Sequence, residues 1–469
     1  MKKRFSLYQE ILAFVRDTGG EIGDRRVRYR FSTAARVVVG LVILMVLGTL
    51  ALMIPWMGKT RPLTFMEAFF TATSALTVTG LSTLTISRDL SFLGQFVLLG
   101  LIQVGGVGYM FVASLAMRII GRRLYILDRL ALSSSLGLDT PETILKILKQ
   151  SFYGILLIEG AGMLLLFFHW GFSGLVDEPN LLFYALFHAV SAFCNAGFDL
   201  FTGLPQYDGL PRDNFTLIIL GSLIFLGGLG IPVLTELLRW QKKRRFSLHT
   251  QVTLVTVGIL VLVGWVGTFA AENSRGVLTD APLLSSLVQT WFHSIASRTA
   301  GFAGLPNFTQ ISPATQLLTM VLMFIGCAPA SMGGGITTGT FSVLGLALWN
   351  YAKGQTTVQV ARRSISVMTV RRASAVLTVS VGLVMLSTFL ILLTNDLPLG
   401  AVLFEVISAF ATCGLSLGLT GQINPFGLVV LCIVMAWGRL GALTIVVAVA
   451  QNPNPVQLVQ YPEEQILIG

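Results

Sequence analysis

Charged side chains are scarce in this chain. Asp, Glu, Lys and Arg make up only 12% of the 469 residues, whereas a soluble protein typically has about 25%. In their place, 54% of the residues are hydrophobic and the mean hydropathy is +0.77. Apolar runs of about 20 residues recur along the whole length. The scarcity of charge argues against a soluble domain, and the runs predict an all-α polytopic membrane protein.

Histidine and cysteine, which often carry catalysis or bind transition metals, are also rare. The chain has four of each, with no HExxH motif, no Ser-His-Asp spacing and no paired metal spacing. We therefore expect no enzyme activity, no disulfide framework and no cofactor in this chain. The residues concerned are His169, His188, His249, His293, Cys194, Cys327, Cys413 and Cys432.

The few basic residues are unevenly distributed. Of the 32 Lys and Arg residues, 25 fall in the segments 2–36, 118–149, 239–245 and 353–372, while the loops on the opposite side carry mainly acids. This asymmetry follows the positive-inside rule and predicts a cytoplasmic N-terminus. Eight spans would bring the C-terminus to the same side. The net charge of +10 therefore needs no nucleic-acid partner to explain it.

A short motif occurs four times and organises the chain. Each copy opens on Phe, passes a small residue near its middle, and ends on Gly followed by Phe or Leu. The glycines Gly80, Gly197, Gly301 and Gly414 are separated by 117, 104 and 113 residues. A near-constant long period indicates one supersecondary unit used four times. One copy alone would more often end a helix or form a turn.

The end of each copy is a candidate ion-filter strand. Glycine adopts backbone angles that let consecutive carbonyls point the same way, and a ring of carbonyls replaces the hydration shell of a permeating cation. Each copy has a single glycine, so we expect few well-formed carbonyl rings and loose selectivity. The predicted filter residues are Thr77, Val78, Thr79 and Gly80; Asn195, Ala196 and Gly197; Thr299, Ala300 and Gly301; and Thr412, Cys413 and Gly414.

The helix preceding each filter strand is only half a bilayer long, so the strand must line a cavity or be buried in protein. We therefore predict four repeats of span, half-helix, filter and span around a central pore, with eight full transmembrane helices and four pore helices. The predicted boundaries are a cytoplasmic segment 1–35, repeats 36–121, 147–241, 251–352 and 372–450, and a cytoplasmic tail 451–469.

The second span of repeat three is interrupted at residues 326–340. Pro329 and three successive glycines cannot hold a regular helix, yet apolar residues flank them on both sides. Irregular backbone at membrane depth is tolerated against a water-filled path, which predicts an intramembrane gate. The equivalent spans carry milder glycine clusters, for which close helix packing and a hinge are equally good interpretations. The predicted gate residues are Ser331, Gly333, Gly334, Gly335, Thr337 and Thr338.

Arg439 is a charged residue inside an apolar span, where a charge costs about 2.5 kcal/mol or more. It is predicted to act as a barrier or gate element, to pair with loop carbonyls, or both. His188, His293 and Glu405 share the position after the motif Phe, matching Thr71. We expect them to anchor the half-helices by hydrogen bonds rather than to bind an ion.

Together these motifs give the chain a specific resemblance. Thr77-Val78-Thr79-Gly80-Leu81, Asn195-Ala196-Gly197-Phe198, Arg298-Thr299-Ala300-Gly301-Phe302, Gly414-Leu415, Gly438-Arg439 and the tail Tyr461-Pro462-Glu463-Glu464 resemble the Ktr/Trk/HKT superfamily of potassium transporters. The likeness covers nearly the full length. It is strongest to the membrane subunits of bacterial Ktr systems, because the chain has no room for the extra N-terminal spans of the Trk type.

The resemblance implies potassium uptake across the bacterial cytoplasmic (inner) membrane, with K⁺ bound at the four filter glycines and Na⁺ as an activator. It also implies a homodimer on a cytoplasmic, nucleotide-binding regulatory ring of the KtrA type. The loop around Ser331–Gly339 would be the gate, with Arg439 against it. Thr337 departs from the family, which commonly has Lys there. An alternative is a Trk-type symporter, coupled to protons or sodium, with relaxed potassium/sodium selectivity.

Overall fold

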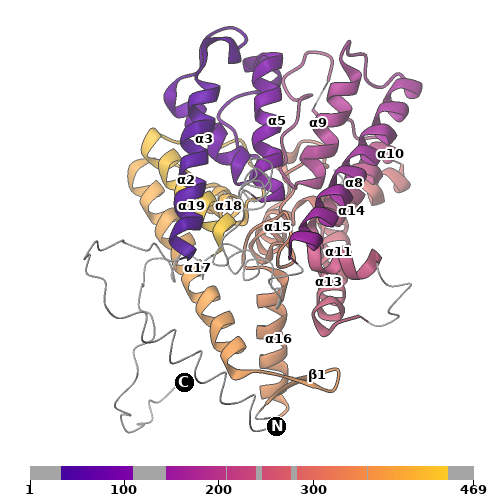
Figure 1. Ribbon diagram of the computed structural model, residues 1–469, viewed down its shortest axis with the longest axis vertical. Helices are drawn as coiled ribbons and strands as arrows, with labels where there is room; N and C mark the ends of the chain where they lie inside the picture. The colour runs from indigo at the N-terminus through magenta and orange to yellow at the C-terminus, as the bar shows by residue number, and fades with distance from the viewer. Residues whose placement is uncertain are drawn as a thin grey trace, which may run out of the picture. The chain divides into compact units, whose positions relative to one another are not determined.

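The computed structural model describes residues 33–108, 144–207, 209–238, 246–275, 282–355 and 357–441 (Figure 1). Within these residues the chain is helical almost throughout, as the composition predicts. The predictions for the N-terminal segment up to residue 32, for residues 109–143 and for the tail from residue 442 lie outside the described residues.

The first motif copy lies on a short helix between two longer ones. The short helix α3 begins with a capping box, in which Thr64 Oγ1 accepts from the Glu67 amide and the Glu67 carboxylate accepts from the Thr64 amide at 2.9 Å. Helices α2 and α5 both pack against it. The elements of this part are α2 Thr33–Leu52, η1 Pro55–Met57, α3 Phe65–Leu76, α4 Ile86–Asp89 and α5 Phe92–Val107.

The second motif copy also lies on a short helix between longer ones, but the helix that follows it is bent. The second span predicted for the repeat 147–241 is not one continuous helix, because α10 and α11 meet at a bend of 105°. Gly230 has φ +84°, and a Cβ there would lie 2.6 Å from the Pro329 carbonyl oxygen. The helix of repeat three is therefore not the single broken one. The elements are α8 Ile144–Ser173, α9 Leu181–Phe193, α10 Asn214–Gly228 and α11 Ile231–Leu238.

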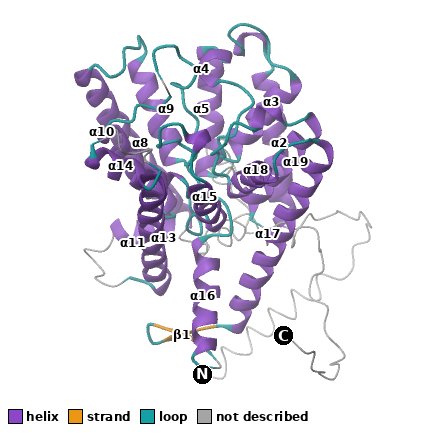
Figure 2. Cartoon of the chain, turned by 180° about the vertical axis from the view of Figure 1, so that it is seen from behind, coloured by secondary structure: helices purple, strands orange, loops and turns teal. Residues whose placement is uncertain are grey.

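The third and fourth copies complete the described chain. Between α16 and α17 lies a two-stranded antiparallel hairpin that the all-α prediction lacked, and it sits where these two helices come together (Figure 2). Strands of three residues are too short to show an alternating pattern. The elements are α13 Leu248–Asn273, α14 Leu283–Ala296, η2 Phe308–Gln310, α15 Pro313–Ile325, α16 Thr338–Ala352, β1 Val358–Val360, β2 Arg363–Ile365, α17 Val367–Thr394, α18 Leu399–Ala411, η3 Thr420–Gln422 and α19 Pro425–Leu440.

Three described helices are long and apolar enough to cross a membrane. They are Gln150–Ser173, Leu248–Asn273 and Val367–Thr394, and the bent pair α10 and α11 makes a fourth if it counts as one span. The other apolar helices have 10–17 residues in the part of the chain that the structure describes. The eight full spans therefore remain a prediction.

The phenylalanine that opens each motif copy is a core residue. Phe70, Phe187, Phe292 and Phe404 are fully buried, each on the face of its short helix that packs against neighbouring helices. In a membrane protein, such a buried side chain holds helices together through van der Waals packing. The shared Phe therefore helps to fix the position of each short helix in the core, and with it the position of the turn that follows.

Candidate functional site

The four motif copies end in the same backbone conformation. In each copy, the residue two positions before the glycine has positive φ, although it is not glycine: Val78 (57°), Asn195 (58°), Thr299 (88°) and Thr412 (49°). The glycines follow with φ of 90° at Gly80, 70° at Gly197, 74° at Gly301 and 94° at Gly414. Positive φ is costly for side-chain-bearing residues and gathers at functional sites. The repetition shows that the motif encodes one turn, used four times.

These four turns meet in a closed ring. A Cβ built on Gly80 would lie 2.4 Å from the carbonyl oxygen of Ala196, and one on Gly197 would lie 2.6 Å from that of Ala300. A Cβ on Gly301 would lie 2.1 Å from the carbonyl oxygen of Cys413.

The ring closes between the last copy and the first. A Cβ on Gly414 would lie 2.1 Å from the carbonyl oxygen of Thr79. Each glycine thus faces the carbonyl directly before the next glycine. Segments more than 100 residues apart in the sequence therefore meet, and only glycine has room at each meeting point.

Serine side chains hold three of the turns from behind. Ser74 Oγ accepts from the Gly80 amide at 3.0 Å, and Ser408 Oγ accepts from the Gly414 amide at 3.1 Å. Ser191 Oγ donates to the Phe198 carbonyl at 2.9 Å. In these three copies the small residue near the middle of the motif is this serine, six residues before the glycine, whereas the third copy has Ile295 there. The motif predicts a small residue at this place, and the role of its hydroxyl follows only from the structure.

The short helices are anchored by buried polar groups at the position after the motif Phe. His188 Nε2 lies 3.0 Å from Asp199 Oδ1, and His293 Nε2 lies 3.0 Å from Thr319 Oγ1. Glu405 accepts from Ser416 and from Thr420, the latter at 3.1 Å. The matching Thr71 Oγ1 has no hydrogen-bond partner among the described residues. Three of the four positions thus make the predicted anchoring hydrogen bonds.

The interrupted span of repeat three lies directly against the ring. Between α15 and α16 the chain passes so close to two filter turns that a Cβ on Gly333 would lie 2.0 Å from Thr299 Oγ1. A Cβ on Gly334 would lie 2.6 Å from Thr412 Oγ1. Glycine is therefore required at these two positions because the loop approaches the filter turns so closely.

The same loop fills the bend between α10 and α11. The amide of Ala328 donates to the Gly228 carbonyl at 3.1 Å, and the Ile231 amide donates to the Ala330 carbonyl at 3.0 Å. The Met332 amide donates to the Gly227 carbonyl at 3.2 Å. The bend thus leaves backbone groups without partners inside the helices, and the loop supplies their hydrogen bonds.

The other predicted gate residues lie at the end of this loop. Gly335 and Thr337 both have positive φ, 81° and 56°, and Thr337 Oγ1 lies 3.4 Å from Thr340 Oγ1. The hydroxyls of Ser331 and Thr338 have no hydrogen-bond partner within the described part of the chain. The loop backbone is therefore strained at Thr337, and these two hydroxyls lack hydrogen bonds among the described residues.

Arg439 joins the loop to the first motif copy. Its guanidinium donates to the carbonyls of Met332 and Gly105, and to that of Gly106 at 3.0 Å. Gly105 and Gly106 lie in the last turn of α5, where helix carbonyls have no partner within the helix. The predicted pairing of Arg439 with loop carbonyls is confirmed.

Buried charged residues other than Arg439 also lie beside the loop and the second filter turn. Arg298 Nη2 donates to the Gly326 carbonyl at 3.0 Å, at the start of the loop. Glu159 on α8 accepts from Gln103 Nε2 at 2.9 Å and lies 3.6 Å from Cys194 Sγ, just before the second filter turn. A charge inside an apolar run was the available signal for Glu159.

The electrostatics of the ring favour a cation. The four short helices end at the turns, so the negative ends of their dipoles meet there together with the backbone carbonyls. No group of three His, Cys, Asp or Glu side chains in the described ranges is placed to hold a metal ion. The arrangement suits weak coordination of a dehydrated monovalent cation by carbonyls rather than tight metal binding.

Comparison with known proteins gives consistent similarities. A family model described as "TrkH: Cation transport protein" matches residues 23–457. The chain is 32% identical over 446 residues to the Ktr system potassium uptake protein B of Bacillus subtilis (strain 168), covering 94% of this chain and 97% of that protein. It is 34% identical over 417 residues to the protein of the same name from Vibrio alginolyticus, covering 87% and 89%.

Two other similarities bear on substrate and fold. The potassium/sodium uptake protein NtpJ of Enterococcus hirae is 31% identical over 462 residues, covering 96% of this chain and all of that protein. The crystal structure of the potassium transporter TrkH from Vibrio parahaemolyticus matches with a TM-score of 0.70 over 92% of this chain and 87% of that chain. Its sequence identity is 18%, so this likeness concerns the fold alone.

Proposed function

This chain belongs to the TrkH family of cation transport proteins, and on that premise we propose that it is the membrane subunit of a bacterial potassium uptake system. It is a multi-pass membrane transporter, not an enzyme. The finer proposal is that four repeats surround a central pore, with both termini on the cytoplasmic side of the inner membrane. The closed ring of four glycine turns carries this proposal.

In the proposed filter, K⁺ loses its hydration water to carbonyls at Gly80, Gly197, Gly301 and Gly414. The chemistry is electrostatic, with no bond made or broken. The carbonyls are held in place by the positive-φ turns and by hydrogen bonds to the short helices, such as Thr79 amide to Ser74 carbonyl at 2.8 Å. A preformed ring needs little reorganisation when the ion arrives.

The proposed gate is the glycine-rich loop below the ring. Gly333 and Gly334 lie against hydroxyls of the filter turns, so the loop as described occupies the space next to the ring. Arg439 holds the loop through Met332 and ties it to the end of α5. Conduction would require the loop to move away, which breaks this hydrogen bond.

The regulatory part of the proposal comes from the relatives. Two of them are named as Ktr system proteins, which supports a regulatory partner of the KtrA type. We also propose a homodimer, a nucleotide-binding ring as that partner, and sodium as an activator. The alternative is coupled symport with relaxed selectivity, and the name of the potassium/sodium uptake relative supports the relaxed selectivity.

The test is cation flux into liposomes that hold the purified protein, comparing potassium with sodium. We expect potassium preference in the wild type and a weaker preference in Gly80→Ser. The matched control is Gly209→Ser, because Gly209 also has positive φ (87°) but its nearest neighbour is 3.5 Å from a built Cβ. Equal flux of both ions, unchanged in Gly80→Ser, would contradict the filter assignment. Potassium flux that stops without a proton or sodium gradient would favour the symporter.

A further inference from the structure

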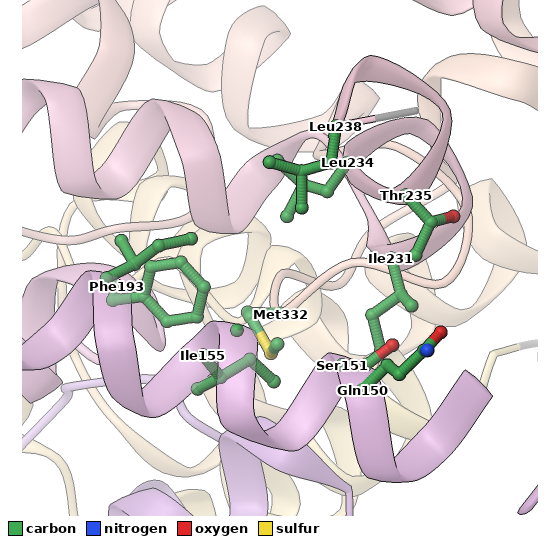
Figure 3. Close-up of a pocket in the computed structure, with 11 residues that line it drawn as sticks. Gln150, Ser151, Ile155, Phe193, Ile231, Leu234, Thr235, Leu238 and Met332 are labelled. Carbon is green, nitrogen blue, oxygen red and sulfur yellow. The ribbon is translucent and has the colours of Figure 1, made fainter. Parts of the chain in front are cut away.

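An apolar cavity of about 300 Å³ lies between α8, α11 and the proposed gate loop (Figure 3). At one end it is lined by Phe193, the last residue of α9 before the second filter turn. Met332, whose carbonyl accepts from Arg439, also lines it. An occupant of this cavity would therefore touch both the support of a filter turn and the loop.

The cavity opens toward the surface that faces lipid. Leu238 lines it and is 77% exposed, and on α8 Tyr153 and Leu157 lie beside the lining residues with exposures of 60% and 72%. In a multi-pass membrane protein, exposed apolar side chains of this kind contact acyl chains. The volume equals roughly ten water volumes of about 30 Å³ each, which suits a stretch of acyl chain rather than a whole lipid.

The opposite end of the cavity is polar. Gln150, Ser151 and Thr235 gather there, away from Phe193 (Figure 3). In the sequence, Lys149 directly precedes Gln150, and Arg239 directly follows Leu238. Each of the two lining segments therefore has a basic residue beside it in the sequence, which favours an anionic lipid as the occupant.

We propose that this cavity binds an acyl chain of an anionic phospholipid from the surrounding bilayer, and that the bound chain holds the gate loop through Met332. The binding site stands on the cavity and its polar end. The effect on the loop rests on the proposed function, in which the described loop position is the closed one. A bound chain thus lowers potassium flux.

Two glycines on α8 provide a matched pair of variants. A Cβ built on Gly154, which lines the cavity, or on Gly160, which does not, meets no atom within 4 Å. Leucine at either position is compatible with the helix and favours it over glycine. Gly154→Leu therefore fills the cavity, while Gly160→Leu makes the same change on the same helix outside it.

The probe is phosphatidylglycerol with a photoreactive diazirine on its acyl chain, in vesicles of phosphatidylethanolamine and phosphatidylglycerol. In the wild type and Gly160→Leu, we expect adducts on peptides that contain the lining residues of α8 and α11. Gly154→Leu should lower this labelling by about tenfold or more, because each displaced methylene costs about fourfold in affinity. Labelling of Gly154→Leu at the wild-type level would overturn the site. Adducts in the wild type that fall only on peptides outside the lining residues would also overturn it.

Potassium flux tests the second half of the proposal. We expect slower flux in the phosphatidylglycerol vesicles than in phosphatidylcholine vesicles for the wild type and Gly160→Leu, and loss of this difference in Gly154→Leu. Equal wild-type potassium flux in the two kinds of vesicle would overturn the proposed effect on the loop. Adducts in a protein without potassium flux would contradict the proposed function and leave the binding site standing.

Discussion

The ring of filter turns makes a sharp prediction at Gly414. An alanine Cβ there would lie 2.1 Å from the Thr79 carbonyl oxygen, so that carbonyl must move by about 1 Å to restore a contact of even 3.0 Å. The same substitution places a side chain at φ +94°, which costs about 1 kcal/mol or more. The displaced carbonyl belongs to Thr79, the filter residue directly before Gly80, so its movement would disturb the Gly80 carbonyl that is proposed to bind the ion.

Gly418 is a control that separates the backbone strain from the contact with the Thr79 carbonyl. It has φ +86°, but a Cβ there finds its nearest neighbour, Thr309 Cγ2, at 3.7 Å. We expect both Gly414→Ala and Gly418→Ala to lower the thermal unfolding temperature through backbone strain, and Gly414→Ala to lower it further because of its contact with the Thr79 carbonyl.

Only Gly414→Ala should change ion flux. We expect its potassium preference over sodium in liposomes to fall by about tenfold, which corresponds to about 1.4 kcal/mol. Wild-type selectivity in Gly414→Ala would refute the filter geometry. Equal losses in both variants would mean that backbone strain, and not the ring contact, is responsible.

Other predictions concern the gate and the first short helix. Arg439→Gln removes the charged hydrogen bond to Met332, worth about 1.5 kcal/mol, so potassium flux should rise about tenfold, whereas Arg439→Lys should show a smaller rise. Thr337→Gly relieves a β-branched residue at φ +56° and should stabilise the protein by about 1 kcal/mol, seen as a higher unfolding temperature. Glu67→Ala removes the capping box of α3 and should cost about 1 kcal/mol of stability, whereas Arg61→Ala, which breaks only the exposed ion pair with Glu67, should cost less.

Much of the candidate site was predictable because its parts are local. The short helices α3, α9, α14 and α18 each lie directly before a filter turn, where the sequence predicts a half-helix. A helix that ends at a polar run before glycine leaves its signal within a dozen residues of sequence. The intramembrane loop was predictable for the same reason, since Pro329 and three glycines break any helix.

The glycine cluster Gly227-Gly228-Leu229-Gly230 shows where prediction stopped. Close packing and a hinge are both compatible with this sequence, and the structure shows close packing together with a bend. A Cβ on Gly227 would lie 1.9 Å from the Phe193 carbonyl oxygen, which is close packing, while Gly230 has positive φ at the bend. Glycine in a sequence says only that a Cβ is missing. Which atom occupies the vacated space depends on residues far away in the chain.

The membrane class, the four-fold motif, the half-helices and the broken span can be predicted from the sequence, because each depends on composition or on neighbours along the chain. The closing of the four turns into one ring, and the contact of Arg439 with carbonyls of both Met332 and Gly106, are seen only in the folded chain. The entry of the loop into the bend of a different repeat is likewise seen only there. These contacts join segments about 100 to 330 residues apart. No local pattern encodes such contacts, because they arise only when all the helices pack together.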